Sequence, residues 1–270
     1  MNMMEIIRAR RSVRTFDGQP LSEEELSDLL NFADTHYNPY GIPITWKILN
    51  AREHKLSSPV ISGTDTWIAG KMKKIPGAEE AFGFAFEKVV LYAQMKGIGT
   101  TWIAGTMDRP AFEKAMALGQ DEVMPCVSPL GFPAKKMSLR ETMMRKGIKA
   151  DSRMPFEKLF FNGSFDHPMS QGGAGSLADP LEMVRLAPSA VNKQPWRVIK
   201  SSDSIHFYEK QSKGYVGADG WDLQKIDIGI AMCHFAIGAE EKGYDLDFYT
   251  ADPQIAHPAD TFYIGSFKLS

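Results

Sequence analysis

The chain has 270 residues, and 31 Lys and Arg against 33 Asp and Glu leave a formal net charge of −2 at pH 7. With 43% hydrophobic and 24% charged residues it has a globular composition, which excludes a disordered chain. The near-neutral charge argues against nucleic-acid binding, which needs a basic face to displace counterions. No apolar run is long enough to cross a bilayer and no secretory pattern is present, so we expect a cytoplasmic protein without a membrane partner.

The first half of the chain predicts alternating helices and strands. A short helix containing Ile6 runs into a basic stretch at residues 8–14, and a capping box at residues 22–25 opens a second helix. A long helix between residues 78 and 96 is closed by Gly97. Short strands are expected at residues 46–49, 101–103 and 128–131. One face of each longer helix is apolar, formed by Leu26, Leu29, Leu30 and Ala33 in the first and by Phe82, Phe86, Val89, Val90 and Ala93 in the second.

The second half repeats this order. Pro180 is expected at the first position of a helix opened by residues 179–182. Residues 222–248 match the long helix of the first half, with an internal Gly and a closing Gly243. Strands are expected at residues 196–199, 246–249 and 263–265. The apolar stripe of this long helix consists of Ile226, Ile230, Cys233 and Ile237. The Gly- and Ser-rich residues 170–176 are expected to form a flexible loop within this half.

The repeat predicts an α+β protein of two related halves, residues 1–145 and 146–270, that share one core. Repeated halves of this size suggest a fused dimer. A two-fold dimer has two equivalent sites at its interface, and fusion allows one site to keep its residues while the other decays.

Two segments could hold a ligand. In residues 8–14 the guanidinium groups and Ser12 could bind a phosphate, or the cations could neutralise the C-terminal end of a helix. In residues 187–196, Pro188 ends the preceding helix and Pro195 is expected to hold Gln194 in an extended conformation. Polar side chains on such a stiffened loop could bind a heteroaromatic edge; an ordinary helix-to-strand connection with a core Trp is the alternative.

Two other segments carry weaker signals. The small residues Ala104 and Gly105 permit close approach of a flat ligand, although a buried strand explains residues 97–105 equally well. Their glycine spacing is not that of a dinucleotide-binding fingerprint. The basic run at residues 131–136, followed by Arg140, is typical of a solvated surface.

Motifs for nucleophilic or metal chemistry are missing from the sequence, which has no G-x-S-x-G, no H-E-x-x-H and no paired Cys. Cys126 and Cys233 are expected to be buried hydrophobic side chains and not a metal or redox site. His206 lies in a strand-like run, which favours a structural role, and His36 could line a pocket.

Four stretches resemble the nitroreductase family of FMN-dependent oxidoreductases, in a fused single-chain form of the TM nitroreductase type. They are RRSVRTF at residues 10–16, KGIGTTWIAG at 96–105, GFPAKK at 131–136 and APSAVNKQPW at 187–196. In the usual family member the Pro-Ser-Asn loop follows the Arg-Ser segment within a few dozen residues. Family members are dimers, and each interfacial FMN takes these two segments from different protomers.

The order of segments here implies one intact site. The first-half counterpart of the loop, residues 34–40, keeps only traces of it. The second-half counterparts of the basic segments are FFNG at residues 160–163 and GSFK at residues 265–268, which provide no comparable cluster of cations. The resemblance therefore implies one FMN per chain, bound in a single-chain pseudo-dimer.

The resemblance also implies which residues contact FMN. The phosphate and the ribityl or pyrimidine groups would be contacted by Arg10, Arg11, Ser12 and Arg14, with Lys135, Lys136 and Arg140 completing the phosphate cage. The isoalloxazine would be contacted by Pro188, Ser189, Ala190 and Asn192 from the second half, with Ala104 and Gly105 beneath the ring near N5. Many relatives carry an acidic residue at or near Ala104, so its absence changes how N5 is tuned.

The implied function is oxidoreduction through FMN, with hydride passing from NADH or NADPH through N5 to a small organic acceptor such as a nitroaromatic or a quinone. No catalytic side chain is expected, because the flavin carries the chemistry. Arg14 is the candidate for stabilising the negative charge of the reduced ring. A flavoenzyme with another reaction, such as dehydrogenation, and a non-catalytic flavin or small-molecule binding protein are the alternatives. The fusion is compatible with a monomer and leaves further association open.

Overall fold

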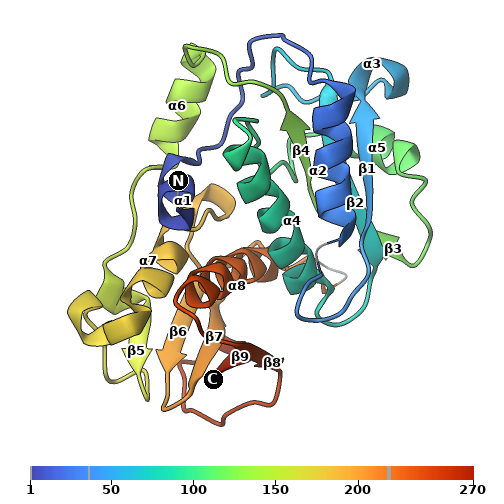
Figure 1. The fold of residues 1–270 in the computed structure, drawn as a ribbon. Coiled ribbons are helices and arrows are strands. Elements are labelled where there is room, and N and C mark those ends of the chain that lie inside the picture. The colour runs from blue at the N-terminus through green and yellow to red at the C-terminus, as the bar shows by residue number, and fades with distance from the viewer. Residues whose placement is uncertain (1, 36, 218–219) are drawn as a thin grey trace. The chain divides into compact units, whose positions relative to one another are not determined.

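The structure is a computed structural model that describes residues 2–35, 37–217 and 220–270 (Figure 1). Its contacts divide the chain into two compact units. Unit 1 comprises Met1–Arg8, Glu79–Phe84 and Asp151–Ser270, and unit 2 comprises Ala9–Ala78 and Ala85–Ala150. The assignment of residues 1–145 and 146–270 to two functional halves stays a prediction.

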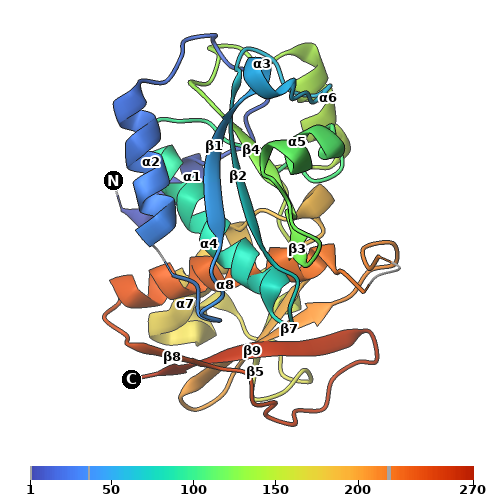
Figure 2. The ribbon, with the colours of Figure 1, turned by 90° about the vertical axis from the view of Figure 1, so that its right-hand side faces the viewer.

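Unit 2 is built on a four-stranded antiparallel sheet in which β2 is central. β1 (Thr45–Asn50) and β4 (Val127–Leu130) flank β2 (Thr66–Lys73), and β3 (Glu122–Val123) pairs with its far end. α2 (Glu23–Thr35) and α4 (Ala78–Met95) lie toward one face, and α5 (Arg109–Ala115) covers the other (Figure 2). The short helices α3 (Ala51–His54) and α6 (Leu139–Gly147) complete this unit.

The two faces of this sheet follow from the alternation of side chains along each strand. Trp46 of β1 contacts Phe86 of α4 with ring centroids 5.4 Å apart. On the opposite face, Trp67 of β2 contacts Phe112 of α5 edge-on at 5.1 Å. The sheet therefore has an apolar layer on both faces, which is why β2 is buried along most of its length.

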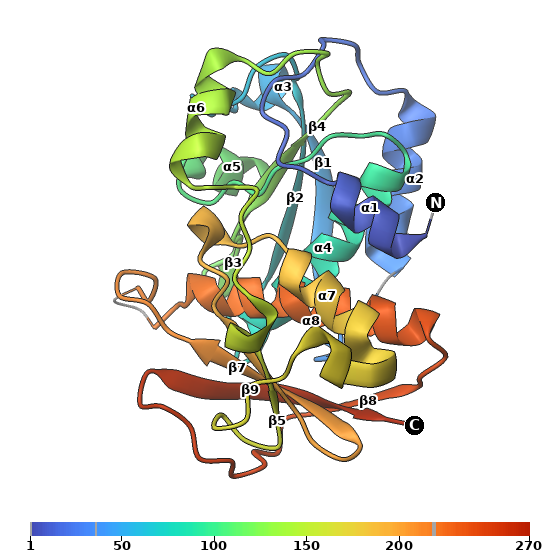
Figure 3. The ribbon, with the colours of Figure 1, turned by 90° about the vertical axis from the view of Figure 1, so that its left-hand side faces the viewer.

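Unit 1 is built on a five-stranded sheet with the order β5-β6-β7-β9-β8. The strands are β5 (Phe160–Asn162), β6 (Trp196–Lys200), β7 (Ser204–Lys210), β8 (Leu246–Tyr249) and β9 (Thr261–Leu269). Only the pairing of β5 with β6 is parallel among these strands. α7 (Ala178–Leu186) and α8 (Leu223–Glu241) cover one face (Figure 3), and α1 (Met3–Ala9) starts in this unit.

The same order of elements recurs in both units, as the repeat predicted. α2, β1, β2, α4 and β4 correspond to α7, β6, β7, α8 and β9, and in each case the two strands of the hairpin are antiparallel. β8, which lies beside β9, has its counterpart at residues 99–103. Ile103 bridges to Val127 of β4, and Gly99 bridges to Gly131, the residue after β4. The regular strand expected at residues 101–103 is not formed. The Thr101 N–H donates to the side-chain Oγ of Ser128 at 3.0 Å, and not to a backbone carbonyl of a neighbouring strand.

Most of the expected helix ends are confirmed. Ser22 and Glu25 make the two reciprocal hydrogen bonds of a capping box, at 3.2 Å and 2.7 Å. Gly97 and Gly243 follow α4 and α8 with φ of 76° and 85°, the left-handed backbone that favours glycine.

Two expectations about local structure are wrong. Pro180 is the third residue of α7 and not the first. Proline is tolerated there because the N–H groups of the first four helical residues have no acceptor within the helix, so the N–H that proline lacks costs no helical hydrogen bond. Residues 171–177 form a 3₁₀ helix and not a flexible loop, because Ser170 Oγ accepts the Gly173 N–H at its start. A kink at Gly175, whose φ is 61°, lets it continue into α7.

The two long helices do not have the single apolar face that their sequences suggest. α8 is buried on nearly all sides from Gln224 to Ala239, and α4 is buried over most of its length. At Gly83 an added Cβ would lie 2.1 Å from the Ile226 carbonyl oxygen, and at Gly229 it would lie 2.1 Å from the Glu80 carbonyl oxygen. Each glycine faces the residue three positions before the other glycine, the reciprocity of a two-fold interface.

Candidate functional site

Three of the four motif segments lie side by side in unit 2. The Val13 N–H donates to the Thr100 carbonyl at 2.8 Å, which places residues 10–14 beside the segment that leads to Ala104. The Asp17 N–H donates to the Phe132 carbonyl at 3.0 Å, and Phe16 bridges to Pro133. Segments far apart in the sequence are thus joined by backbone hydrogen bonds.

The basic stretch contributes a cluster of arginines with two carboxylates. Arg11 Nη1 donates to Glu141 Oε1 at 2.8 Å, and the Glu141 side chain has no exposed area. Burial lowers the pKa of Arg10 and of Arg14 below the ordinary value. The negative charges of Glu87 beside Arg10 and of Glu141 beside Arg14 oppose this, while the positive charge of Arg145 lowers both pKa values further.

Part of this cluster has no protein acceptor. Among the described residues, Arg10 Nε and Arg14 Nε and Nη1 are buried without a hydrogen-bond partner. A buried donor left unsatisfied costs about 1–3 kcal/mol, and more when it is charged. The cluster has a net charge of +2, because it combines four arginines with two glutamates: Arg10, Arg11, Arg14 and Arg145 with Glu87 and Glu141. A phosphate monoester carries about −1.5 to −2 at pH 7, so this cluster has the donors and the charge to bind one.

Arg145 was not identified from the sequence, although a signal existed. Arg145 follows Glu141 by four residues on α6, so the two side chains lie on the same face of that helix. The sequence shows only this spacing of an acid and a cation, and the burial of Glu141 against Arg11, which makes the pair part of the cluster, comes from the tertiary structure.

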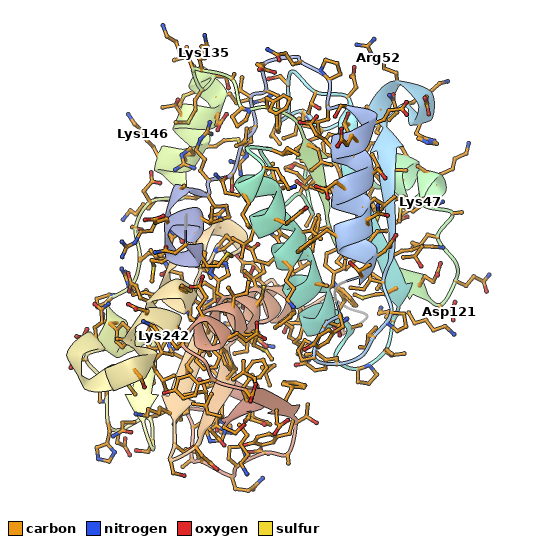
Figure 4. All side chains as sticks on the ribbon, in the orientation of Figure 1. Lys47, Arg52, Asp121, Lys135, Lys146 and Lys242 are labelled. Carbon is orange, nitrogen blue, oxygen red and sulfur yellow. The ribbon has the colours of Figure 1, made fainter. Side chains whose placement is uncertain are left out.

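The other expected phosphate ligands are more exposed. Lys135, Lys136 and Arg140 are all exposed, and Lys135 points outward near α6 (Figure 4). Arg140 Nη1 donates to the Pro59 carbonyl. These three residues are not among the charges that shift the pKa of Arg10 or Arg14. Their role in a phosphate cage stays a prediction.

Ala104 and Gly105 lie in a turn held by one arginine. Arg109 donates to the Ala104 carbonyl at 3.0 Å and also to the Met124 and Pro125 carbonyls, at 2.7 Å and 3.1 Å. A Cβ at Gly105 would meet nothing within 4 Å, so the space above it is open. The neighbouring Trp102 donates its Nε1–H to Glu87 at 3.0 Å, which connects this turn to the charge beside Arg10.

The loop at residues 187–196 belongs to unit 1, where it follows the end of α7 at Leu186. Ser189 Oγ accepts the Gln194 N–H at 2.8 Å, and Gln194 Oε1 accepts the Met154 N–H at 2.8 Å. Asn192 Nδ2 donates to the Ser152 carbonyl at 3.1 Å. Trp196 is fully buried, as a core role requires, and Pro188 is half-buried at the start of the loop.

The extended conformation expected of Gln194 is wrong, because its φ is 51°. Val191 and Asn192 also have positive φ, 51° and 57°, although neither is glycine. Each left-handed residue of this kind costs roughly 1–2 kcal/mol. The loop is therefore a strained, tethered turn, and the buried side chain of Gln194 supports it from inside.

Buried acids lie under this loop. Both oxygens of Asp227 accept the Ala190 N–H, at 3.0 Å and 3.1 Å, and Asp227 is 4% exposed. Burial raises the pKa of Asp227 well above its ordinary value, and it raises the pKa of Glu80 to about 7. Burial, with the carboxyl of Asp222 next to it, raises the pKa of Glu209 to about 8.

The first-half counterpart of the loop is used locally. Asn38 is 4% exposed, and its Nδ2 donates to the Ile42 carbonyl at 2.7 Å. His36 lies outside the described residues. His206 is buried in β7, where its Nδ1 lies 2.6 Å from Ser266 Oγ, in accord with a structural role. Cys126 and Cys233 are both buried, as expected.

No group of three or more His, Cys, Asp or Glu side chains in the described part of the chain is arranged to hold a metal ion. None of its helices combines the length and apolar character that a membrane crossing requires.

Several solved structures are similar to this chain, and one of them, with a TM-score above 0.5, shows the fold. A crystal structure described as a "putative nitroreductase" from Thermotoga maritima aligns with a TM-score of 0.62 at 21% identity, covering 100% of this chain and 93% of that one. A nitroreductase family protein from Clostridium difficile aligns at 0.47 and 15% identity, over 58% of this chain and 96% of that one. An FMN-dependent nitroreductase from Clostridium difficile aligns at 0.42 and 16% identity, over 49% and 88%. No curated protein matches the chain.

The sequence itself matches a family model over most of its length. The model, described as "Putative TM nitroreductase", matches residues 2–239. That range includes the arginine cluster, the turn at Ala104 and the loop at residues 187–196. The chain therefore belongs to this nitroreductase family and has the nitroreductase fold, with two related halves in one polypeptide.

Proposed function

We propose that the protein is an FMN-dependent oxidoreductase that passes hydride from NADH or NADPH to a small organic acceptor, such as a nitroaromatic or a quinone. The observation that carries the proposal is the set of buried guanidinium N–H groups of Arg10 and Arg14 that have no acceptor among the described residues. Membership of the nitroreductase family supplies the reaction class.

The proposed site takes residues from both units. Arg10, Arg11, Ser12 and Arg14 would hold the phosphate and its neighbouring groups, with Arg145 added to the set and Lys135, Lys136 and Arg140 outside it as supporting cations. Pro188, Ser189, Ala190 and Asn192 would contact the isoalloxazine. That both groups of residues bind the same FMN molecule is part of the proposal.

The residues of the chain would bind and orient, and no side chain need act as acid or base. FMN, when bound, supplies hydride transfer through its N5 atom. Guanidinium groups bind phosphate with paired N–H donors, which holds the cofactor by its anionic end. A fixed positive charge at Arg14 would stabilise the negative charge that the ring gains on reduction. The turn at Ala104 and Gly105 leaves open space for a flat group.

A titration of the purified chain with FMN tests the site. The chain should carry yellow flavin or bind it in solution, and the double substitution Arg10→Ala with Ser12→Ala should raise the Kd for FMN at least about 100-fold, since a hydrogen bond to a charged group contributes about 1.5–3 kcal/mol. Arg8→Ala, at an exposed position of α1, is the matched control and should leave the Kd unchanged. A chain that neither carries nor binds flavin contradicts the proposal.

Rapid mixing with each nicotinamide separates the remaining functions. Bleaching of the flavin absorbance by NADH or NADPH, followed by reoxidation by a quinone or nitroaromatic, is the expected result. FMN that binds but is bleached by neither nicotinamide would identify a flavin-binding protein or a flavoenzyme with another reaction, such as dehydrogenation.

A further inference from the structure

The loop at residues 187–196 takes its shape partly from a residue that lies far from it in the sequence. Asp227 is on α8, and both its carboxylate oxygens accept the Ala190 N–H, at 3.0 Å and 3.1 Å. Asp227 is 4% exposed, so water does not compete for this hydrogen bond. Ala190 comes directly before Val191 and Asn192, the two residues that turn left-handed.

We propose that Asp227 is a positioning residue that holds residues 189–192 in the one conformation that can contact a flavin ring. The inference rests on the proposed function, in which Ser189, Ala190 and Asn192 contact the isoalloxazine. Asp227 acts through the loop and is not itself a ligand in this proposal.

Asp227 ties the middle of the turn to the helix beneath it. The Ser189 hydroxyl closes the loop onto the Gln194 N–H, and Asn192 is tied to the Ser152 carbonyl. Two backbone hydrogen bonds close the turn on itself, from the Asn192 N–H to the Ser189 carbonyl at 3.0 Å and from the Lys193 N–H to the Ala190 carbonyl at 3.1 Å. The hydrogen bond from the Ala190 N–H to Asp227 then fixes the turn against α8. A strained turn persists only where its surroundings determine it, so loss of this hydrogen bond lets residues 190–192 relax.

The same hydrogen bond decides which atoms of the loop remain for a ligand. The Ala190 N–H is engaged with Asp227 and cannot donate to a ring atom. Ser189 Oγ accepts from Gln194, so the hydroxyl hydrogen of Ser189 remains to donate. The hydrogen-bond donor to the flavin ring on this side would therefore be the Ser189 hydroxyl and not the Ala190 N–H.

Asp227 is also suited to a conservative test. Burial raises its pKa, and the nearby carboxyls of Asp222 and Glu209 raise it further. A neutral side chain of the same shape can therefore replace it, and the amide oxygen of an asparagine can still accept the Ala190 N–H.

Titrations with FMN and with riboflavin test the proposal on the full chain. Asp227→Ala should raise the Kd for both ligands by the same factor, about tenfold, because the apparent affinity falls with the fraction of loops in the competent conformation. Asp227→Asn should stay within about threefold of the wild-type Kd. Arg10→Ala, on the phosphate side, should weaken FMN far more than riboflavin.

Asp222→Asn is the matched control. Asp222 is a buried carboxylate at the start of the same helix, where it caps Gln224 at 2.9 Å and accepts from Gln211 at 3.1 Å. Wild-type affinity in Asp227→Ala, a loss confined to FMN, or an equal loss in Asp222→Asn would each overturn the proposal. A wild-type chain that binds no flavin would instead refute the proposed function.

Hydrogen–deuterium exchange of the chain without ligand provides a readout that needs no flavin. The Ala190 amide should exchange slowly in the wild type and in Asp227→Asn, where the amide oxygen still accepts it, and at least about tenfold faster in Asp227→Ala. Fast exchange of this amide in the wild type overturns the proposal even if Asp227→Ala does not fold.

Discussion

Arg10 and Glu209 represent two opposite ways in which this chain buries charge. Arginine stays protonated at every accessible pH, and the buried Nε–H of Arg10 has no acceptor among the described residues, so an anion from outside the chain would satisfy it. A buried carboxyl can instead take up a proton. Glu209 has no exposed area, neither of its oxygens has a hydrogen-bond partner among the described residues, and burial together with the nearby Asp222 raises its pKa to about 8.

Glu209→Gln should therefore change the pH dependence of stability. Between pH 4.5 and about 8 the folded chain keeps a proton on Glu209 that the unfolded chain releases, so the free energy of unfolding falls as the pH rises through this window. Glutamine carries no charge to bury, so the variant should match the wild type near pH 5 and exceed it by roughly 1–3 kcal/mol near pH 9. Denaturant unfolding across this range measures the difference.

An exposed glutamate is the control for this prediction. Glu157→Gln lies at an exposed position of unit 1 and should show no such divergence between the two pH values. A constant difference between Glu209→Gln and the wild type from pH 5 to pH 9 would show that Glu209 is ionised in the folded chain.

At the scale of elements, the contact between α8 and the first turns of α4 is decided by two glycines. A helix pair approaches to backbone contact only where both helices lack side chains, and Gly83 and Gly229 are placed at that point in each repeat. The absence of a Cβ thus matters here for packing and not for backbone conformation.

Gly83→Ala and Gly229→Ala should each destabilise the protein by about 1–3 kcal/mol or more, because the added Cβ meets a carbonyl oxygen of the facing helix backbone, which cannot rotate away. Thermal unfolding measures the loss. Gly147→Ala, at the end of α6 with nothing within 4 Å of an added Cβ, should leave the stability unchanged or slightly raised. Wild-type stability in both helix variants would contradict the close contact.

At the scale of the whole molecule, both halves of the repeat keep the same order of helices and strands, but each half keeps a different part of the candidate binding residues. The cation cluster occurs in unit 2, and its second-half counterpart is β5, a strand of the sheet with the sequence FFN. The tethered loop occurs in unit 1. In its first-half counterpart the buried Asn38 side chain donates to the Ile42 carbonyl within the same segment. Divergence of this kind predicts a single cofactor site per chain.

Isothermal titration should find one FMN per chain, and variants on either side should affect that same site. Arg14→Ala and Asn192→Ala should both weaken the one binding event, since the proposed site takes residues from both units. Two FMN per chain, or Asn192→Ala without any effect on FMN affinity, would contradict the proposed pairing of these segments.

Local patterns in the sequence were sufficient for much of this protein. The capping box at Ser22, the closing glycines and the strands at residues 46–49, 196–199 and 246–249 depend on neighbouring residues, so short stretches predicted them. The four motifs and the repeat indicated the family, because a motif is a property of the order of residues.

Other features depend on residues that only tertiary structure brings together. The all-round burial of α8, the hydrogen bond from the Thr101 N–H to Ser128 Oγ and the left-handed Gln194 arise from contacts between distant segments. Arg145 beside Arg14 and Asp227 beneath Ala190 belong to the same class. Burial and hydrogen-bond partners are properties of positions in space, and they decided which charges remain unmatched and which residues shape the loop.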